Sequence, residues 1–336
     1  MPDHLTIRAD GDAEIGVGHL VRCYALAQAW KRQGGRVTLV TKRFPDRLTE
    51  WDGLERIELG DVVAEADLVT TLAAGDGWVV VDGYHFDKTY LCAIHAAGRP
   101  LLVIDDTIRL DYYPVTALLN PSPGFSKADF VCPPNAATLL GPNYAMLRGE
   151  VLQARTPQEN PSEQTRILVT MGGSDPRCLT RIVLEGILLL DPQEFKTQVI
   201  LGPSNPSHRE ISSLAEGRDD IEILLSPADF PHLASRADIA ITAAGSTCWE
   251  LAYLGTPSLT VTAADNQRPI ASAVDRAGAG ESLGDGSLLA PRELSDRVVR
   301  LAANPDRLAR MGSAGQRLVD GSGAERVVSR LQEHPS

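Results

Sequence analysis

Short apolar runs alternate with amphipathic stretches along most of the chain, an alternation typical of repeated βα units with a parallel sheet. In the first half the pattern predicts strands over Leu5–Ala9, Arg36–Thr41, Trp78–Asp82, Leu101–Asp105 and Val115–Leu119. In the second half it predicts strands over Arg166–Met171, Thr197–Leu201, Ile221–Leu224, Ile239–Thr242 and Ser258–Val261. The C-terminal stretch shows helical periodicity alone. The pattern therefore predicts an α/β fold with two series of parallel strands.

A polar segment separates the two series. Residues 153–165 show no apolar period and include two prolines, which is typical of a linker. We therefore predict an N-terminal domain over residues 1–152 and a C-terminal domain over residues 166–336, the latter including the C-terminal helices. The length of 336 residues suits two domains of roughly 150 residues each.

The first predicted strand runs into a glycine-rich turn and then into a helix expected over His19–Arg32. The turn carries Gly16 and Gly18 and places His19 at the helix N-terminus. Unpaired N–H groups there attract phosphates, and an imidazole beside them can move protons. The same loop is also compatible with a histidine that only caps or packs. Val21 stands where the dinucleotide fingerprint requires a third glycine, which disfavours a nicotinamide cofactor.

Two loops in the second half have a similar form. Each follows a predicted strand, and their residues are Gly172, Gly173, Ser174 and Asp175 in one and Gly245, Ser246 and Thr247 in the other. Glycines let backbone amides approach a phosphate closely, and serine or threonine caps a following helix. Each loop alone is equally compatible with a plain tight turn. Together with His19 they favour an enzyme that acts on a phosphorylated ligand.

Charge and composition narrow the class of ligand. The net charge of −12 and pI near 5.1 argue against broad binding to nucleic acid or anionic membranes, which requires clustered Lys and Arg. The five cysteines are scattered singly, without metal-ligand spacing, and indicate reduced thiols. No run approaches the length of a membrane span. We therefore expect a cytoplasmic protein without membrane insertion.

Several short motifs occur in order along nearly the whole chain. They are Asp10-Gly11-Asp12, Ile15-Gly16-x-Gly18-His19-x-x-Arg22, Val81-Asp82-Gly83-Tyr84, Ile104-Asp105-Asp106, Leu139-Leu140-Gly141-Pro142-x-Tyr144-x-x-Leu147-Arg148, Gly172-Gly173-Ser174-Asp175, Ala244-Gly245-Ser246-Thr247-x-Trp249-Glu250 and Asn266-Gln267. In this order they resemble the UDP-2,4-diacetamido-2,4,6-trideoxy-β-L-altropyranose hydrolases of pseudaminic acid biosynthesis, which are grouped with spore-coat polysaccharide proteins. The resemblance implies a GT-B architecture, in which two Rossmann-like domains face each other across a cleft and the C-terminal domain chiefly holds the nucleotide.

The resemblance also implies an activity. An inverting hydrolase would cleave the anomeric C–O bond of a UDP-linked amino sugar and release UDP and free sugar for nonulosonic acid biosynthesis. His19 would be the general base that activates water. A diphosphate is a good leaving group, so no second carboxylic acid is required, as it would be for an ordinary glycoside. The expected partners are the UDP-sugar and UDP alone, without cofactor or metal.

Further residues receive roles from the resemblance. Glu250 would accept hydrogen bonds from the ribose hydroxyls. Asn266 and Gln267 would bring side-chain amides to the sugar or the phosphates. Tyr84 would line the sugar side of the cleft.

Acidic residues at predicted strand ends complete the candidate site, because α/β sites are built at the carboxyl ends of strands. Asp10, Asp105 and Asp106 occupy such positions, and we expect Asp10 either to orient His19 or to cap the loop. Arg22 lies one helical turn beyond His19 on the same face. We expect Arg22 either to neutralise a phosphate or to brace the aspartates.

Two alternatives stand beside the hydrolase. A GT-B glycosyltransferase would share the fold and the nucleotide pocket but pass the sugar to an acceptor. A non-catalytic nucleotide-sugar-binding protein would need no histidine at position 19, so His19 argues against it. Arg177-Cys178 and Gly83 depart from the family pattern, which leaves the sugar and the nucleotide base open, with CMP- and GDP-sugars as the other candidates.

Overall fold

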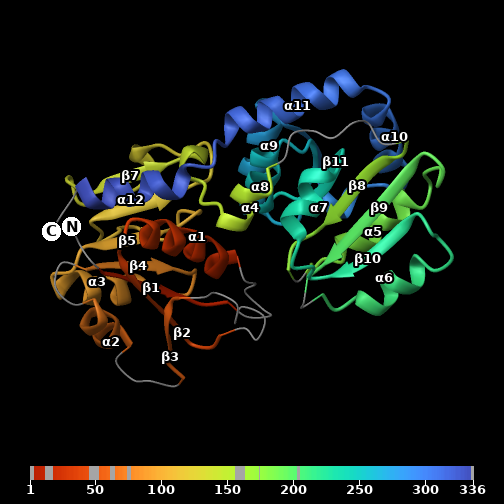
Figure 1. Ribbon diagram of the computed structural model, residues 1–336. Helices are drawn as coiled ribbons and strands as arrows, with labels where there is room; N and C mark the ends of the chain where they lie inside the picture. The colour runs from red at the N-terminus through yellow and green to blue at the C-terminus, as the bar shows by residue number, and fades with distance from the viewer. Residues whose placement is uncertain are drawn as a thin grey trace. The chain divides into compact units, whose positions relative to one another are not determined.

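The computed structural model describes residues 4–11, 18–44, 53–60, 65–73, 77–155, 163–173, 175–202 and 205–333. The chain divides into two compact units, each described by itself (Figure 1). Unit 1 comprises Met1–Gly149 and Gly321–Ser336, and unit 2 comprises Glu150–Asp320. Of the predicted linker, residues 156–162 lie outside the described residues.

Unit 1 is built on a parallel sheet that, within the described residues, has seven strands in the order β3-β2-β1-β4-β5-β6-β7. The strands are β1 (His4–Ala9), β2 (Arg36–Thr41), β3 (Glu55–Glu58), β4 (Trp78–Asp82), β5 (Leu101–Ile104), β6 (Ala117–Asn120) and β7 (Ala137–Leu140). The central strands β1 and β4 are buried along their whole length. A parallel strand that is covered on both faces needs an uninterrupted apolar run, which explains why the sequence shows these strands so clearly.

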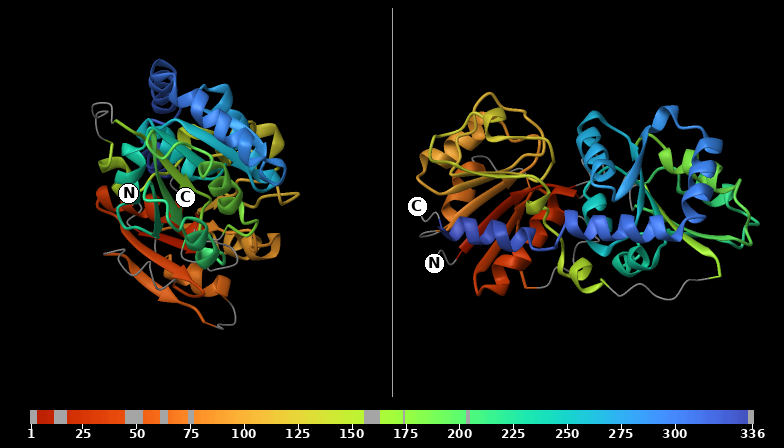
Figure 2. Two further views of the ribbon diagram at one scale, coloured as in Figure 1. Left: turned by 90° about the vertical axis from the view of Figure 1, so that its right-hand side faces the viewer. Right: turned by 90° about the horizontal axis from the view of Figure 1, so that it is seen from above.

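Helices cover both faces of this sheet (Figure 2). Those of unit 1 are α1 (Gly18–Arg32), α2 (Glu65–Leu72), α3 (Lys88–Ala96) and α12 (Gly323–Glu333), with short 3₁₀ turns η2 (Lys127–Asp129) and η3 (Pro142–Tyr144). One core cluster joins α1 and α12 to one face of the sheet, and a second joins α2 and α3 to the other. Gly34, with φ +85°, follows α1 and ends it in the left-handed conformation that glycine favours.

Unit 2 repeats this architecture. Its described sheet has six parallel strands in the order β10-β9-β8-β11-β12-β13. They are β8 (Thr165–Thr170), β9 (Phe195–Leu201), β10 (Ile221–Leu225), β11 (Ile239–Ala243), β12 (Ser258–Thr262) and β13 (Gly280–Asp285). The helices are α4 (Gly149–Gln153), α5 (Leu179–Ile187), α6 (His208–Leu214), α7 (Phe230–Arg236), α8 (Thr247–Leu254), α9 (Arg268–Arg276), α10 (Pro291–Ala302) and α11 (Pro305–Leu318), with 3₁₀ turns η4 (Asp265–Gln267) and η5 (Gly286–Leu288).

Each sheet has a topological switch point, where the strand order reverses direction. In unit 1 it lies between β1 and β4, and in unit 2 between β8 and β11. Ligands of open α/β sheets bind outside the carboxyl ends of the strands at this point. The segment leading to His19 follows β1, and the two glycine-rich loops of unit 2 follow β8 and β11. All three motifs therefore lie at the switch point of their own sheet.

The last helix corrects one prediction. We expected all C-terminal helices in the second domain, but α12 packs on unit 1 against α1 and η3. Val327, Val328 and Leu331 are at most 1% exposed in the same core cluster as α1. Burying such a side chain stabilises a fold by about 1.5–3 kcal/mol. The apolar face of α12 has its partner in unit 1, which its helical periodicity alone does not reveal.

Candidate active site

The central contact of the candidate site in unit 1 joins His19 to Asp82. His19 is the second residue of α1, and Asp82 is the last residue of β4. His19 Nδ1 lies 2.7 Å from Asp82 Oδ1, and the two side chains are 8% and 0% exposed. Arg22 Nη2, which can only donate, lies 3.0 Å from the same Nδ1. The contact to Asp82 is shorter and an ionised carboxylate only accepts hydrogen bonds, so Nδ1–H is assigned as the donor and Nε2 carries the lone pair of the neutral ring. The contact thereby selects the ring nitrogen that is presented as a base.

Arg22, which lies on α1 like His19, also binds the carboxylate of Asp82. Its Nε donates to Asp82 Oδ2 and its Nη2 to Asp82 Oδ1, both at 2.6 Å, while Nη1 donates to Asp106 Oδ2 at 3.0 Å. Burial alone would raise the pKa of the Asp82 carboxyl, but the charges of Arg22 and then His19 outweigh it and hold that pKa well below its usual range. Arg22 therefore braces two aspartates, which is the second of the two roles expected for it.

Tyr84 contacts His19 with its ring and Asp106 with its hydroxyl. The two rings meet edge to face with 4.8 Å between their centroids, and the Tyr84 hydroxyl donates to Asp106 Oδ1 at 2.6 Å. Burial and the neighbouring Asp106 charge raise the pKa of the Tyr84 hydroxyl above its usual value, so it remains a donor at neutral pH. The structure thus brings together four of the predicted residues: His19, Arg22, Tyr84 and Asp106.

Asp10 corrects a second prediction, because its carboxylate is not the one on His19. Asp10 accepts a pair of hydrogen bonds from Arg8 at 2.6 and 2.7 Å, and one from the backbone N–H of Lys42 at 2.7 Å. His85 Nε2 lies 2.9 Å from its Oδ2. The histidine that Asp10 orients is therefore His85, and the orienting role at His19 belongs to Asp82.

A clamp that the sequence did not suggest holds the segment carrying Tyr84. Asp105 is fully buried and binds Arg109 Nε at 3.0 Å and the Tyr113 hydroxyl at 2.7 Å. Arg109 Nη1 then donates to the backbone carbonyls of Tyr84 at 3.0 Å and Phe86 at 2.8 Å. Two of the three partners of Arg109 are backbone carbonyl groups, which any residue would supply, so no sequence motif indicates this role.

The first glycine-rich loop of unit 2 approaches a neighbouring strand very closely. Gly172 has φ +88°, and a Cβ placed on Gly202, just after β9, would lie 2.0 Å from the carbonyl oxygen of Gly173. Gly202 is therefore required for this approach and was not among the predicted residues. Ser174 and, in unit 1, Gly16 lie outside the described residues. Gly18 is the first residue of α1, and a Cβ added to it would meet no atom within 4 Å.

Asp175 has a structural role in addition to the binding role predicted for it, which stays a prediction. Its buried carboxylate accepts hydrogen bonds from Leu179 N at 2.9 Å, from Thr180 N at 2.8 Å and from the Thr180 hydroxyl at 2.6 Å. A side chain in this position satisfies the unpaired N–H groups at a helix N-terminus. Asp175 therefore caps α5. Its carboxylate binds the backbone N–H groups of Leu179 and Thr180, which would otherwise be available to a phosphate.

The N-terminus of α8 differs from that of α5. Ser246 is its N-cap and makes no side-chain capping hydrogen bond, and Thr247 is the first helical residue. Gly245, which precedes them, has no atom within 4 Å of the position a Cβ would take. Backbone N–H groups at such a helix start are suited to a phosphate group. Of the two loops of unit 2, this one offers the better anion site.

Three further predicted residues surround the carboxyl ends of β11 and β12. Glu250 is half-buried on α8, one turn from its start, and Asn266 is exposed on η4. Gln267 Oε1 accepts a hydrogen bond from the backbone of Ala263 at 2.8 Å. The Gln267 carbonyl therefore shapes its own loop. The binding roles of Glu250 and Asn266 stay predictions.

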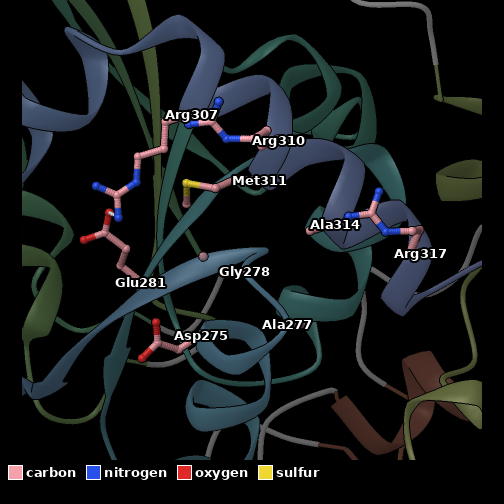
Figure 3. Close-up of a pocket in the computed structure, with 10 residues that line it drawn as sticks. Asp275, Ala277, Gly278, Glu281, Arg307, Arg310, Met311, Ala314 and Arg317 are labelled. Atoms are coloured by element: carbon pink, nitrogen blue, oxygen red, sulfur yellow. Dashed lines mark ion pairs between the residues drawn. The ribbon is translucent and has the colours of Figure 1, made fainter.

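The described residues include no group of three or more His, Cys, Asp or Glu side chains able to hold a metal ion. A cavity of about 420 Å³ in unit 2 lies elsewhere, among the end of α9, the start of β13 and one face of α11 (Figure 3). Arg307 points toward Glu281 across it, at 2.7 Å. Because the start of β13 is the amino edge of the sheet, this cavity is separate from the loops described above.

In the part of the chain that the structure describes, no helix has both the length and the apolar character needed to cross a membrane.

Comparison with known proteins identifies the fold. Residues 166–327 match the model of the glycosyltransferase family 28 C-terminal domain. The crystal structure of MurG from Acinetobacter baumannii superimposes with a TM-score of 0.66, over 99% of this chain and 100% of that one, at 17% identity. The fold is GT-B. The predicted fold class is thus confirmed for each α/β unit, while the cleft between them stays a prediction.

Two relatives have names that state a biosynthetic or enzymatic role. The chain is 25% identical to the spore coat polysaccharide biosynthesis protein SpsG of Bacillus subtilis, over 98% of both chains. It is 26% identical to a Helicobacter pylori protein named pseudaminic acid cytidylyltransferase and UDP-2,4-diacetamido-2,4,6-trideoxy-beta-L-altropyranose hydrolase, over 57% of this chain and 35% of that protein. The resemblance inferred from the motifs is thus matched along the full length by the first relative and over part of the chain by the second.

Proposed function

We propose that the protein is an inverting hydrolase that releases UDP from a UDP-linked amino sugar, with His19 as its general base. The buried His19–Asp82 pair carries this proposal. A general base needs a fixed orientation and a stabilised protonated form, and a neighbouring carboxylate provides both. Asp82 remains ionised because Arg22 holds its pKa well below the usual range.

The reaction follows from this arrangement. His19 Nε2 takes a proton from water while the water oxygen attacks the anomeric carbon. The bond from that carbon to the diphosphate oxygen breaks, and its electron pair leaves with UDP. Asp82 stabilises the imidazolium, which then loses its proton to solvent. One UDP-sugar and one water thereby give UDP, a free sugar of inverted configuration and one proton.

The nucleotide would bind to unit 2. The N-terminus of α8 offers the backbone N–H groups of Ser246 and Thr247 to the diphosphate, where they would stabilise charge building on the leaving group. Glu250, one turn further on, would accept hydrogen bonds from the ribose. The match of residues 166–327 to a glycosyltransferase C-terminal domain supports a nucleotide site in this unit.

The names of the relatives support the choice of substrate. SpsG is named for polysaccharide biosynthesis, and the Helicobacter pylori protein is named in part for hydrolysis of a UDP-linked diacetamido sugar. We therefore infer a diamino sugar destined for nonulosonic acid biosynthesis of the pseudaminic type.

The experiment is to incubate the protein with UDP-, GDP- and CMP-linked amino sugars in ¹⁸O-water, without acceptor, and to follow the products by NMR. Release of UDP with unlabelled diphosphate, and of an inverted sugar carrying ¹⁸O, is the expected result. Label in the diphosphate would contradict attack at the anomeric carbon, and retained configuration would contradict a single inverting displacement.

A glycosyltransferase is the second candidate. The family model matched by unit 2 is that of a glycosyltransferase domain, and the fold serves both reactions. The same experiment separates the two, because a transferase binds the nucleotide sugar but does not release UDP until an acceptor is added. Binding without release in all samples would therefore favour the transferase.

A further inference from the structure

A second histidine–aspartate pair lies at the switch point of unit 1, beside the pair described above. His85 Nε2 lies 2.9 Å from Asp10 Oδ2, and the side chains are 39% and 9% exposed. Asp10 follows β1 and His85 follows β4. These adjacent strands are the ones that carry the His19 site. The imidazole of His85 is thus partly exposed, whereas the carboxylate of Asp10 that it contacts is buried.

The carboxylate of Asp10 accepts several hydrogen bonds in addition to its contact with His85. Arg8, which is fully buried, donates to both of its carboxylate oxygens, and the Thr41 hydroxyl donates at 3.0 Å. Arg8 also pairs with Glu65, and its guanidinium lies 4.8 Å from the centre of the Phe86 ring. Burying such an ion network carries a desolvation cost that attraction between the charges offsets only when the geometry is good. Its effect here is to present one imidazole in a fixed orientation.

Gly83 makes room for that orientation. The backbone at Gly83 has φ +157°, and a Cβ there would lie 2.9 Å from His85 Cε1 and 2.9 Å from Phe86 Cε2. The His85 ring also packs on Phe86 with 4.0 Å between ring centres. A larger residue at position 83 would push the imidazole out of its place against Asp10.

The contact also decides what His85 can bind. With Nε2–H donating to Asp10, Nδ1 of the neutral ring is a hydrogen-bond acceptor. A phosphate at neutral pH offers few donors, whereas sugar hydroxyl and acylamino groups each offer an O–H or N–H. Tyr84, the preceding residue, already contacts His19. In the neutral form of His85, Nδ1 therefore favours the hydroxyl and N–H groups of the sugar over the diphosphate.

We propose that His85 binds the sugar of the nucleotide-linked substrate through Nδ1, with Asp10 as its positioning residue. This proposal rests on the proposed function, because it takes the ligand to be a nucleotide sugar. It adds a residue that determines which sugar is accepted. His19 and Asp82 would perform the reaction, while the second pair would recognise a hydroxyl or acylamino group away from the anomeric carbon.

The test compares affinities for UDP and for UDP-linked sugars by titration calorimetry, using UDP-glucose, UDP-N-acetylglucosamine and the diacetamido sugar nucleotide. All proteins compared, including the one with the natural residue at position 85, carry His19→Gln so that no substrate is consumed during the titration. The quantity of interest is the ratio of the Kd of UDP to the Kd of the sugar nucleotide that binds best. In His85→Ala this ratio should fall by about five- to tenfold, the equivalent of one hydrogen bond, while the Kd of UDP stays unchanged. His95→Ala, an exposed histidine of α3, is the matched control and should alter neither value.

A second variant separates recognition from folding. His85→Gln keeps an amide N–H for Asp10 and a carbonyl oxygen as acceptor, so it should recover part of the ratio. An unchanged ratio in a folded His85→Ala protein would overturn the proposal, as would a protein with His85 intact to which no sugar adds affinity. Because binding is measured without turnover, a protein that binds these ligands but releases no UDP would refute the hydrolase and still test His85.

Discussion

Asp82 Oδ1 lies 2.7 Å from His19 Nδ1, and Arg22 donates to both oxygens of the same carboxylate. The imidazole therefore cannot turn without breaking a contact to a group that is itself held at both oxygens. Asp82 is fully buried at the end of β4, and α1 supplies both His19 and Arg22. One strand end and one helical turn thus define the orientation of the proposed base.

Replacement of His19 by Gln tests the base directly. We expect the rate of UDP release to fall by about a hundredfold or more, which is the usual share of a general base. The Kd of UDP should stay unchanged, because the proposed diphosphate site lies at the start of α8. Turnover at saturating substrate and calorimetric affinity for UDP are the two measurements.

The matched control for this variant is His95→Gln, at an exposed position of α3. It should leave both quantities as in the wild type. Full turnover in His19→Gln would remove His19 from the mechanism.

Tyr84→Phe separates the two contacts of Tyr84. Phenylalanine keeps the ring against His19 but loses the hydroxyl that donates to Asp106. Because Arg22 still holds Asp106, we expect turnover to fall by less than about tenfold, within the effect of one hydrogen bond. Tyr84→Ala also removes the ring and should cost more. An equal loss in Tyr84→Phe and Tyr84→Ala would show that the ring contact contributes nothing.

Arg109→Met tests the clamp on the segment 84–86. Methionine cannot bind the carbonyls of Tyr84 and Phe86 or the carboxylate of Asp105. Tyr84 and His85 would then be less firmly placed, so the KM for the UDP-sugar should rise several-fold while the Kd of UDP stays the same. Kinetics with and without UDP as competitor measure both quantities.

The control is Arg300→Met, an exposed arginine of α10, which should leave the KM unchanged. An unaltered KM in a folded Arg109→Met protein would show that the segment keeps its place without the clamp.

Asp82→Asn tests the charge of the buried carboxyl through the pH dependence of stability. The Asp82 pKa is held below its ordinary value of 3.8 by Arg22 and His19, against the effect of burial. Such a group stabilises the fold above the unfolded-state pKa, and that contribution is lost as the pH falls below it. The free energy of unfolding of the wild type should therefore decrease more steeply below pH ~4 than that of Asp82→Asn, by up to about 1.4 kcal/mol per pH unit.

Urea unfolding between pH 5 and the acid limit of folding measures these slopes. Asp10 also has a depressed pKa and remains in both proteins, so the comparison isolates Asp82. Parallel curves for the two proteins would show that Asp82 titrates normally in the fold.

Most strands that the sequence predicts have both faces covered, with the edge strand β10 as an exception. β1, β2 and β4 match their predicted ranges to within one residue, because parallel strands between two helical layers need continuous apolar runs. The strands without a prediction, β3, β7 and β13, all lie at sheet edges. There one neighbour is missing and polar residues are tolerated, as in the sequence Glu55-Arg-Ile-Glu58 of β3.

Four members of the site, His19, Arg22, Tyr84 and Asp106, were predicted, but Asp82 was not predicted as the partner of His19. Asp10 and Asp82 follow adjacent strands, and Ala9 pairs in register with Asp82, so the sequence places both near His19. Which of them meets the imidazole depends on Arg8, whose buried guanidinium takes up Asp10. The sequence alone does not distinguish the Arg8–Asp10 ion pair from two charged residues that happen to lie two positions apart.

Asp175 offers the sharpest contrast between prediction and structure, and a variant decides between them. As a cap of α5, Asp175→Ala should lower the free energy of unfolding by about 1–2 kcal/mol. Asp175→Asn should cost less, because Asn also caps helices and tolerates the positive φ of 42° at this position. Neither variant should weaken UDP binding beyond the loss of folded protein. If Asp175→Asn keeps its stability but loses affinity for UDP, the carboxylate contacts the nucleotide, and the capping hydrogen bonds seen here give way when the ligand binds.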